Sequence, residues 1–362
     1  MRSVAALLAA VLAGSAMMAC GDDGAEPGAP AGVTPAREAT LVLDFQPNAV
    51  HTGIYAAERR GYFDDEGVDL RIQEPGGTAD GAKLLEAGRA DLAILDINDF
   101  GIARQRGLEI AAVAAIVQRP LASVIAADET EIRTVGDLAG KTVGVTGVPS
   151  DDAVLDTVLA QAGLAPDAVK RQTIGFQSVP LLAAGRIDAA TAFWNAEGVA
   201  LRQRAIPTRE FRVDELGAPR YPELVLVAPD AAAQAVIPQA SADQHPSLIC
   251  SVLSALEAGY DELERNPDRS LDALLEAVPE LPPEEQRAQL SALVATQAFS
   301  RPGKVAATAV LEREAGARWL RWASDAAVVD PPPGSAAARA IEAGFKPLTA
   351  SCGEGGRLTT PK

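Results

Sequence analysis

Polar and aromatic residues follow several predicted strands, at positions suited to holding a small molecule. Asn48 comes after the first predicted strand, and a side-chain amide can both donate to and accept from the edge of a nitrogen heterocycle. Trp194 ends a later strand, and an indole can stack on a flat ring. These residue types favour recognition of a flat heteroaromatic molecule.

Each of these residues also has a purely structural interpretation. Asn48 could serve only the turn that it occupies, and His51 could cap the helix that starts there. Asp96 could pair with a ligand amino group or cap the next helix. Trp194 could pack between two lobes.

Two loops could contribute backbone groups. The turn Glu74–Thr78 is rich in glycine, and its N–H groups could meet an anionic or carbonyl oxygen. It lacks the lysine and the spacing of a P-loop, so we do not expect nucleotide hydrolysis. The second loop carries Thr146, Pro149 and Ser150. The candidate ligand-binding residues are Asn48, His51, Gly76, Gly77, Thr78, Asp96, Asn98, Gln118, Thr146, Pro149, Ser150, Trp194, Asn195, Glu197 and Tyr221.

An internal repeat indicates how these loops are positioned. Leu84–Ala93 (LLEAGRADLA) returns as Leu181–Ala190 (LLAAGRIDAA), with seven of ten positions identical. Gly88 and Gly185 suit the left-handed position that ends a helix. The segments before the two copies also match in order, so we expect two α/β lobes, each β-α-β-α-β.

Apolar runs and turn signals place the remaining elements. From 246 to 327 the chain is expected to be helical, and these helices are expected to pack on the first lobe. The predicted strands cover 40–46, 68–73, 91–95, 110–116, 123–127, 142–146, 170–174, 189–193 and 224–228. The predicted helices are 51–62, 79–87, 100–106, 150–163, 246–265, 270–278, 283–296 and 306–327.

The N-terminal segment is typical of a bacterial export signal. Arg2 precedes a small apolar run that is too short to span a membrane. The run ends in Met17-Met18-Ala19-Cys20, which resembles a lipobox. We expect residues 1–19 to be a signal peptide, Cys20 to carry lipid and residues 20–38 to form a flexible tether. An ordinary secreted protein cut nearby is the alternative.

The other two cysteines, Cys250 and Cys352, make an even pair in an exported chain. Such a pair suggests one disulfide, and two buried thiols are the alternative. Neither cysteine has metal-site spacing, so we expect no metal and no cofactor.

The net charge of −17 with no basic run argues against a nucleic-acid partner. It also argues against direct adhesion to anionic lipid.

Several phrases resemble a known family. Asp44–Tyr55 (DFQPNAVHTGIY) is similar to the opening of the thiamine-pyrimidine family, and Ala87–Asp91 and Asp137–Gly144 resemble a wider class of sulfonate, taurine and nitrate binders. The resemblance covers about residues 40–230. It implies a type 2 periplasmic-binding-protein fold, in which two doubly wound α/β lobes are joined by a two-strand hinge, with crossings near 123–129 and 221–228. The implied lobes are 39–126 with 225–350, and 127–224, followed by a tail at 351–362.

The resemblance implies a substrate-binding lipoprotein of an ABC importer, held outside the cytoplasm by its lipid. Its expected partners are ABC permease subunits and a small ligand, a thiamine pyrimidine precursor or a ring such as riboflavin, and we expect a monomer. An alkanesulfonate, taurine or nitrate binder of the same fold is the alternative, with donors from Ser150 and Arg119. A pyrimidine synthase is disfavoured because the chain has no cysteine cluster and is exported. Lys83, the one lysine before Lys141, is expected on a helix surface.

Overall fold

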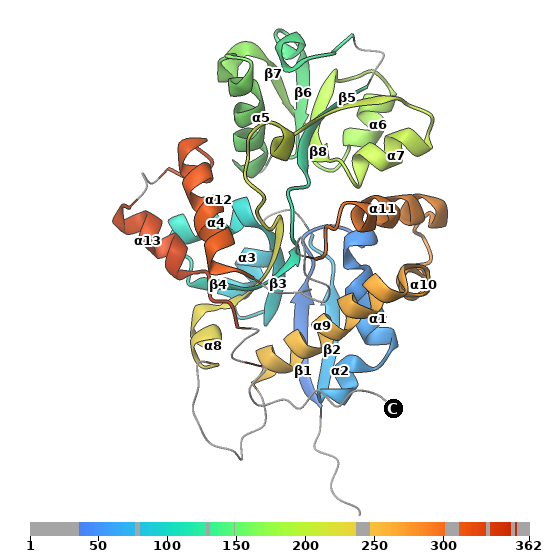
Figure 1. Ribbon diagram of the computed structural model, residues 1–362, viewed down its shortest axis with the longest axis vertical. Coiled ribbons are helices and arrows are strands. Elements are labelled where there is room, and N and C mark those ends of the chain that lie inside the picture. The colour runs from blue at the N-terminus through green and yellow to red at the C-terminus, as the bar shows by residue number, and fades with distance from the viewer. Residues whose placement is uncertain are drawn as a thin grey trace, which may run out of the picture. The chain divides into compact units, whose positions relative to one another are not determined.

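The computed structural model describes residues 36–76, 80–127, 131–147, 149–236, 247–300, 311–330, 334–348 and 352. Over these ranges the chain forms an α/β fold with two five-stranded sheets (Figure 1). None of the helices in this part of the chain is long and apolar enough to cross a membrane. The predicted signal peptide, Cys20 and most of the predicted tether lie outside the described residues.

The first sheet has the strand order β2-β1-β3-β10-β4, and β10 runs antiparallel to both of its neighbours. β1 pairs in parallel with β2 and β3. All eight residues of β4 are buried, as expected for a strand that is covered on both faces. The strands are β1 (Arg37–Val42), β2 (Val68–Gln73), β3 (Leu92–Asp96), β4 (Ile110–Val117) and β10 (Leu224–Pro229).

The second sheet repeats this topology in the order β7-β6-β8-β5-β9. β6 pairs in parallel with β7 and β8, whereas β5 runs antiparallel to β8 and β9. The two predicted β-α-β-α-β units are therefore present. The strands are β5 (Ala122–Ala127), β6 (Thr142–Val145), β7 (Lys170–Thr173), β8 (Ala189–Phe193) and β9 (Thr208–Arg212).

The chain passes between the sheets earlier than predicted. It leaves the first sheet after Val117 and enters the second at Ala122, and it returns between Arg212 and Leu224. The predicted crossing at 123–129 and lobe boundary at 126/127 would assign β5 to the first lobe, but its ladder partners belong to the second sheet. An apolar run shows that a strand is buried without showing which sheet contains it.

The helices cover both sheets, and those after residue 247 pack largely on the first one. α9 and α10 contact α1, α13 contacts α4, and α11 contacts α7 of the second sheet as well as α10. The helices are α1 (Thr52–Arg59), α2 (Tyr62–Asp65), α3 (Asp80–Glu86), α4 (Ile97–Gln105), α5 (Pro149–Gln161), α6 (Ser178–Ala183), α7 (Glu197–Gln203), α8 (Asp230–Gln234), α9 (Leu248–Arg265), α10 (Pro267–Ala277), α11 (Pro283–Ala295), α12 (Arg313–Asp325) and α13 (Ala336–Ala343).

The repeated phrase has the same local structure in both sheets. Gly88 and Gly185 have φ values of 63° and 61°, so each ends its helix in the left-handed conformation that glycine adopts most easily. The carboxylates of Asp91 and Asp188 then accept the N–H groups of Thr40 (2.8 Å) and Thr142 (2.7 Å). Each aspartate thereby fastens the start of its strand to the neighbouring parallel strand.

Close packing of α1 against α9 fixes the first loop of the cleft. A Cβ on Gly259 would lie 2.2 Å from the carbonyl oxygen of Gly53, and one on Gly53 would lie 2.5 Å from the Tyr260 ring. The two helices can therefore approach this closely only with glycine at both positions. The Tyr260 hydroxyl donates to the Val50 carbonyl at 2.8 Å, which holds the turn that follows β1.

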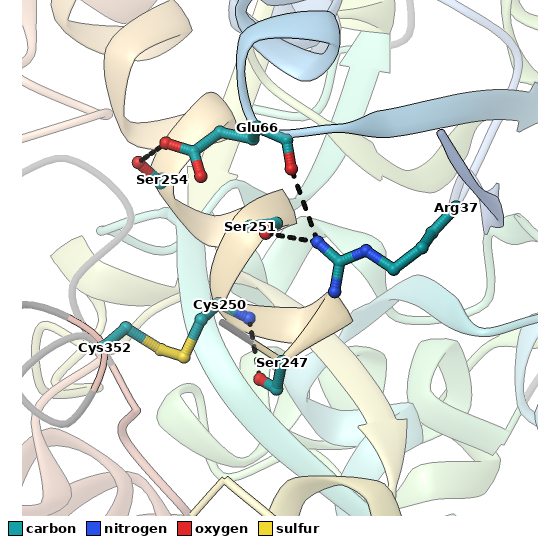
Figure 2. The surroundings of a disulfide bond; sticks show 7 residues. All are labelled: Arg37, Glu66, Ser247, Cys250, Ser251, Ser254 and Cys352. Carbon is teal, nitrogen blue, oxygen red and sulfur yellow. Dashed lines mark hydrogen bonds between the residues drawn. A yellow bond between two sulfur atoms is a disulfide. The ribbon is translucent and has the colours of Figure 1, made fainter. Parts of the chain in front are cut away.

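A disulfide joins Cys250 of α9 to Cys352 (Figure 2), so the first of the two alternatives for this pair is the one observed. The same stretch of α9 is tied to β1, because Arg37 donates to the Ser251 hydroxyl at 2.6 Å and to the Glu66 carbonyl at 3.3 Å. The Ser254 hydroxyl donates to the Glu66 carboxylate at 2.7 Å. α9 is thus anchored at several points on the first sheet.

Candidate functional site

The strand ends of the two sheets enclose a cleft with an empty volume of about 1110 Å³, its open mouth included. The residues that carry its chemistry come from the loop after β1, from β3 and from α4 on one side, and from α5, β8, α7 and the loop after β7 on the other. The polar and aromatic lining consists of Asp44, Phe45, Asn48, Asp96, Asp99, Ser123, Thr146, Ser150, Asp151, Phe176, Ser178, Thr191, Phe193, Asn195 and Glu197.

Six of the predicted site residues line this cleft: Asn48, Asp96, Thr146, Ser150, Asn195 and Glu197. The structure therefore brings residues from both repeats to one cavity. Gly76 is described but does not line it. Gly77, Thr78 and the side chain of Pro149 lie outside the described residues.

Asn195 is the most suggestive of the six. It is fully buried, lines the cleft, and neither its amide nitrogen nor its amide oxygen has a partner within the described part of the protein. An unpaired buried amide costs free energy. A ligand with one acceptor and one donor on adjacent atoms would satisfy both groups.

Asn48, in contrast, uses both the oxygen and the nitrogen of its side-chain amide for hydrogen bonds within the turn. Its oxygen accepts the Val50 N–H at 3.0 Å, and its nitrogen donates to the Gln46 carbonyl at 3.0 Å. The turn interpretation of Asn48 is therefore observed, although the residue also borders the cleft.

His51 does not line the cleft and is fully buried behind it. Its Nδ1 accepts the Asn48 N–H at 3.1 Å, which leaves the proton on Nε2. Nε2 then donates to the Asp44 carboxylate at 2.9 Å. His51 therefore orients Asp44, which does line the cleft, instead of facing a ligand itself.

Trp194 points away from the cleft. It is 1% exposed, and its indole N–H donates to the Pro120 carbonyl at 3.1 Å. The guanidinium groups of Arg212 and Arg119 lie 4.2 Å and 5.3 Å from its ring centroid. The packing interpretation of Trp194 is the one observed, because cation-π contacts occupy the ring.

Three phenylalanines supply the aromatic lining instead. Phe45 follows β1, Phe176 follows β7 and Phe193 ends β8. The rings of Phe45 and Phe176 meet edge to face from opposite sheets, with centroids 4.5 Å apart. A flat guest would pack against these rings.

The remaining predicted residues have other partners. The Asn98 oxygen accepts the Trp319 indole N–H at 2.9 Å. Tyr221 is buried with its ring stacked on Trp322 at 5.3 Å. Gln118 lies at the first crossing, where its carbonyl accepts from Arg220 at 3.0 Å. None of the three lines the cleft.

The electrostatic character of the cleft was not predicted. Five carboxyl groups line it, from Asp44, Asp96, Asp99, Asp151 and Glu197, and its described lining contains no lysine, arginine or histidine. Asp99 and Asp151 appear in the sequence only as acidic residues in the first turns of helices, where they read as helix-dipole partners. The one signal in the sequence was that several acids follow predicted strand ends.

Burial raises the pKa of several carboxyls in the cleft. It raises the pKa of Asp99 to about 8, with the charge of Asp96 adding to the rise, and it raises the pKa of Glu197 to about 7. Burial also raises the pKa of Asp151, although hydrogen bonds from Thr146 and Thr191 oppose that rise. The cleft can therefore offer both carboxylate acceptors and carboxylic-acid donors near neutral pH.

No group of His, Cys, Asp and Glu in the described residues is arranged to hold a metal ion.

Comparison with known proteins shows the family of this chain. A family model described as NMT1/THI5 like matches residues 48–270, more than half of the chain. The chain belongs to this family.

Curated relatives agree with membership of the NMT1/THI5 like family. A formylaminopyrimidine-binding protein of Halalkalibacterium halodurans is 31% identical over 65% of this chain and 69% of its own length. A Haemophilus influenzae protein named for thiamine biosynthesis is 29% identical over 66% of this chain and 73% of its own. Proteins named 4-amino-5-hydroxymethyl-2-methylpyrimidine phosphate synthase match at lower identity.

The fold is that of periplasmic binding proteins. The alkanesulfonate-binding protein SsuA of Xanthomonas axonopodis pv. citri, solved with MOPS, superposes with a TM-score of 0.63 at 17% identity, over 83% of this chain and 96% of that one. This likeness establishes the predicted type 2 periplasmic-binding-protein architecture.

Proposed function

We propose that this protein is an extracytoplasmic substrate-binding lipoprotein of an ABC importer. In this proposal it captures a small amino-substituted nitrogen heterocycle, such as the pyrimidine of thiamine or a related ring, between its two sheets. Closure of the sheets over the ligand would present the loaded form to permease subunits. The relative named for formylaminopyrimidine binding supports this ligand class.

One observation carries the ligand class: the cleft is lined by five carboxyls and the unpaired amide of Asn195, without a cationic side chain in its described lining. An exocyclic amine donates to carboxylates, and a ring nitrogen accepts from an amide N–H or a protonated acid. The edge of an aminopyrimidine carries both groups side by side. Phe45, Phe176 and Phe193 would contact its faces.

The same lining disfavours the alternative of a sulfonate, taurine or nitrate ligand. An anion in this cleft would meet carboxyl oxygens from both sheets with no positive charge to offset them. Arg119, considered as a donor for such a ligand, is paired with Asp214 and lies over Trp194.

The lining also favours binding over the synthase alternative. The part of it that the structure describes contains no lysine that could hold pyridoxal phosphate and no cysteine. Lys83 is exposed on α3 and does not line the cleft. We therefore propose a binding protein that needs no cofactor.

Calorimetry with 4-amino-5-hydroxymethyl-2-methylpyrimidine, riboflavin, taurine and nitrate tests the ligand class. We expect the pyrimidine to bind with micromolar or tighter affinity, and we expect the zwitterion taurine and the anion nitrate to give no heat. Asn195→Ala should weaken pyrimidine binding about tenfold or more, the cost of one or two lost buried hydrogen bonds. The matched control is Gln203→Ala, an exposed amide at the end of α7, which should bind as the wild type does. Binding of taurine or nitrate in place of the pyrimidine would refute the assignment.

The anchor is tested separately. Incorporation of labelled palmitate into the wild-type protein, with loss of both label and membrane attachment in Cys20→Ala, would support lipidation at Cys20. Retention of the label in that variant would contradict it. Gel filtration of the soluble form tests the expected monomer.

A further inference from the structure

Glu223 connects Asp96, which lines the cleft, to both crossings between the sheets. It is fully buried, and its Oε2 accepts the Leu121 N–H at 2.6 Å in the first crossing. Its own N–H donates to the Val117 carbonyl, and its carbonyl accepts from Ile97, both at 2.9 Å. Glu223 itself stands at the end of the second crossing, directly before β10.

The other carboxylate oxygen of Glu223 has no conventional donor. Oε1 is buried and has no hydrogen-bond donor among the described residues. The carboxyls of Glu223 and Asp96 are neighbours that share a hydrogen bond, and Asp96 lies opposite Leu224, the residue after Glu223, in the ladder of β3 and β10. Two carboxyl groups can be hydrogen-bonded only through a proton, so this contact requires that one of them be protonated.

The surroundings indicate which carboxyl holds the proton. Glu223 accepts the backbone N–H groups of Leu121 and Ala122, which stabilise its ionised form. Asp96 accepts one backbone N–H, from Asn98 at 2.6 Å. Burial and the neighbouring Glu223 raise the pKa of Asp96 well above its usual value. The proton therefore resides on Asp96 and is donated to Glu223.

The charged groups around this pair are nearly all acidic. Asp99 on α4 and Asp151 on α5 face Asp96 from the cleft, and Asp214 faces Glu223 from the second crossing. Tyr221 is buried beside both, with its own pKa raised by burial. Arg106 acts on Asp99, and Arg119 is paired with Asp214. Among the described residues, the charged groups that act on the Asp96 carboxyl are all acidic, so a ligand could supply the missing cation.

We propose that the cleft selects a ring that carries positive charge, and that such a ligand displaces the proton that Asp96 shares with Glu223. On binding, the O–H bond of Asp96 breaks, the proton passes to the buffer, and the Asp96 carboxylate pairs with the ligand cation. A neutral ring leaves the proton in place. The inference rests on the proposed function, and it adds that Asp96 and Glu223 determine specificity for ligand charge.

The test uses two ligands that share the aminopyrimidine ring. Thiamine carries a fixed positive charge, and 4-amino-5-hydroxymethyl-2-methylpyrimidine is uncharged at pH 7.5. Calorimetry in phosphate and Tris buffers, whose ionisation heats differ, counts the protons released. We expect thiamine to release about one more proton than the neutral ring, and its affinity to rise between pH 6 and pH 8.

Glu223→Gln is the decisive variant. The glutamine amide can donate to Asp96 permanently, which holds Asp96 ionised and leaves no shared proton. Thiamine should then release about one proton fewer, bind about tenfold more tightly than wild type at pH 6, and lose most of its pH dependence. Binding of the neutral ring should change less than threefold. Glu86→Gln, which removes an exposed carboxylate on α3, should match the wild type.

Asp96→Asn is a second variant that tests the same inference if Glu223→Gln does not fold. It should release about one proton fewer with thiamine and, unlike Glu223→Gln, bind thiamine at least tenfold more weakly. Equal proton release by the two ligands, or unchanged release in the variants, would overturn this inference while leaving the proposed function intact. Thiamine binding with proton release but no binding of the neutral ring would support the inference. Failure of both ligands to bind would overturn the inference and the proposed function together.

Discussion

The two copies of the repeated phrase agree where their strands begin and differ where the strands end. At the beginnings, Asp91 and Asp188 do the same work, because each accepts a backbone N–H from the neighbouring parallel strand. At the ends, β3 leads to Asp96 and Asp99, whereas β8 leads to Phe193, Asn195 and Glu197. The strand starts are shared scaffold, and the strand ends carry the chemistry of the cleft.

Carboxylates at the strand starts and carboxylates at the strand ends also affect the stability of the fold in opposite ways. Asp188 is partly exposed, and the hydrogen bond that its carboxylate accepts from Thr142 is favourable. Asp99 and Glu197 have raised pKa values because burial disfavours their charge. The cleft therefore keeps groups that weaken the unliganded protein, as expected where function requires a polar site.

The largest expected loss of stability comes from removing the disulfide, which is found only beside the first sheet among the described residues. Cys250→Ser should lower the free energy of unfolding by about 4 to 5 kcal/mol, because the disulfide closes a loop of 102 residues in the unfolded chain. Urea denaturation of the oxidised protein and the variant measures this. A loss below about 1 kcal/mol would mean that the cross-link contributes little to the body built on the first sheet.

The next effect concerns the strand ends. The folded-state pKa of Asp99, about 8, lies above its unfolded value, so the folded protein binds an extra proton and loses stability as pH rises from about 4 to 8. Asp99→Asn should flatten this decline and raise stability at pH 8 by about 1 kcal/mol or more. Thermal unfolding from pH 5 to pH 8.5 checks it. A variant that follows the pH profile of the wild type would show that Asp99 titrates normally.

A smaller, paired effect is expected at the helix ends. Gly88→Ala and Gly185→Ala should each cost about 1 kcal/mol, because alanine disfavours the left-handed backbone. A Cβ at either position would meet no atom within 4 Å, so the two losses should be nearly equal. Chemical denaturation of both variants measures the pair, and a clear inequality would show that the two copies are not equivalent.

The smallest effect concerns the strand starts. Asp188→Ala should cost about 1 kcal/mol for its lost hydrogen bond, and Asp91→Ala somewhat less because Asp91 is more exposed. Neither should alter ligand affinity, since neither lines the cleft. A change in binding by either variant would break the division between strand starts and strand ends.

Local patterns predicted most of the fold. The strands of both repeats lie within a few residues of their expected positions, because apolar runs and turn glycines are signals carried by the segment itself. β9 (Thr208–Arg212) was not predicted, since its sequence TREFR is polar and it forms the edge of the second sheet. α13 (Ala336–Ala343) was also missed, because the predicted helices end at residue 327.

The site was predicted less well, for a reason visible in particular side chains. The sequence predicted the cleft at the strand ends, but it could not show which of several adjacent side chains turns toward the cleft. Trp194 does not line the cleft because Pro120 and Arg212 hold its ring within the core, and the two are adjacent to it only through the fold. His51 likewise faces Asp44. Such choices depend on contacts between distant segments.

The exchange of strands between the sheets has a consequence for how the molecule can form. β10 sits between β3 and β4 but is synthesised only after the whole second sheet, and β5 leaves the first body to pair beside β8. The first sheet therefore cannot complete its hydrogen-bonded ladder from an uninterrupted piece of chain, whereas the strands of the second sheet, β5 to β9, are consecutive in sequence. A fragment that stops before β10 would expose the facing edges of β3 and β4, so we expect assembly to be cooperative and truncated products to be prone to aggregation.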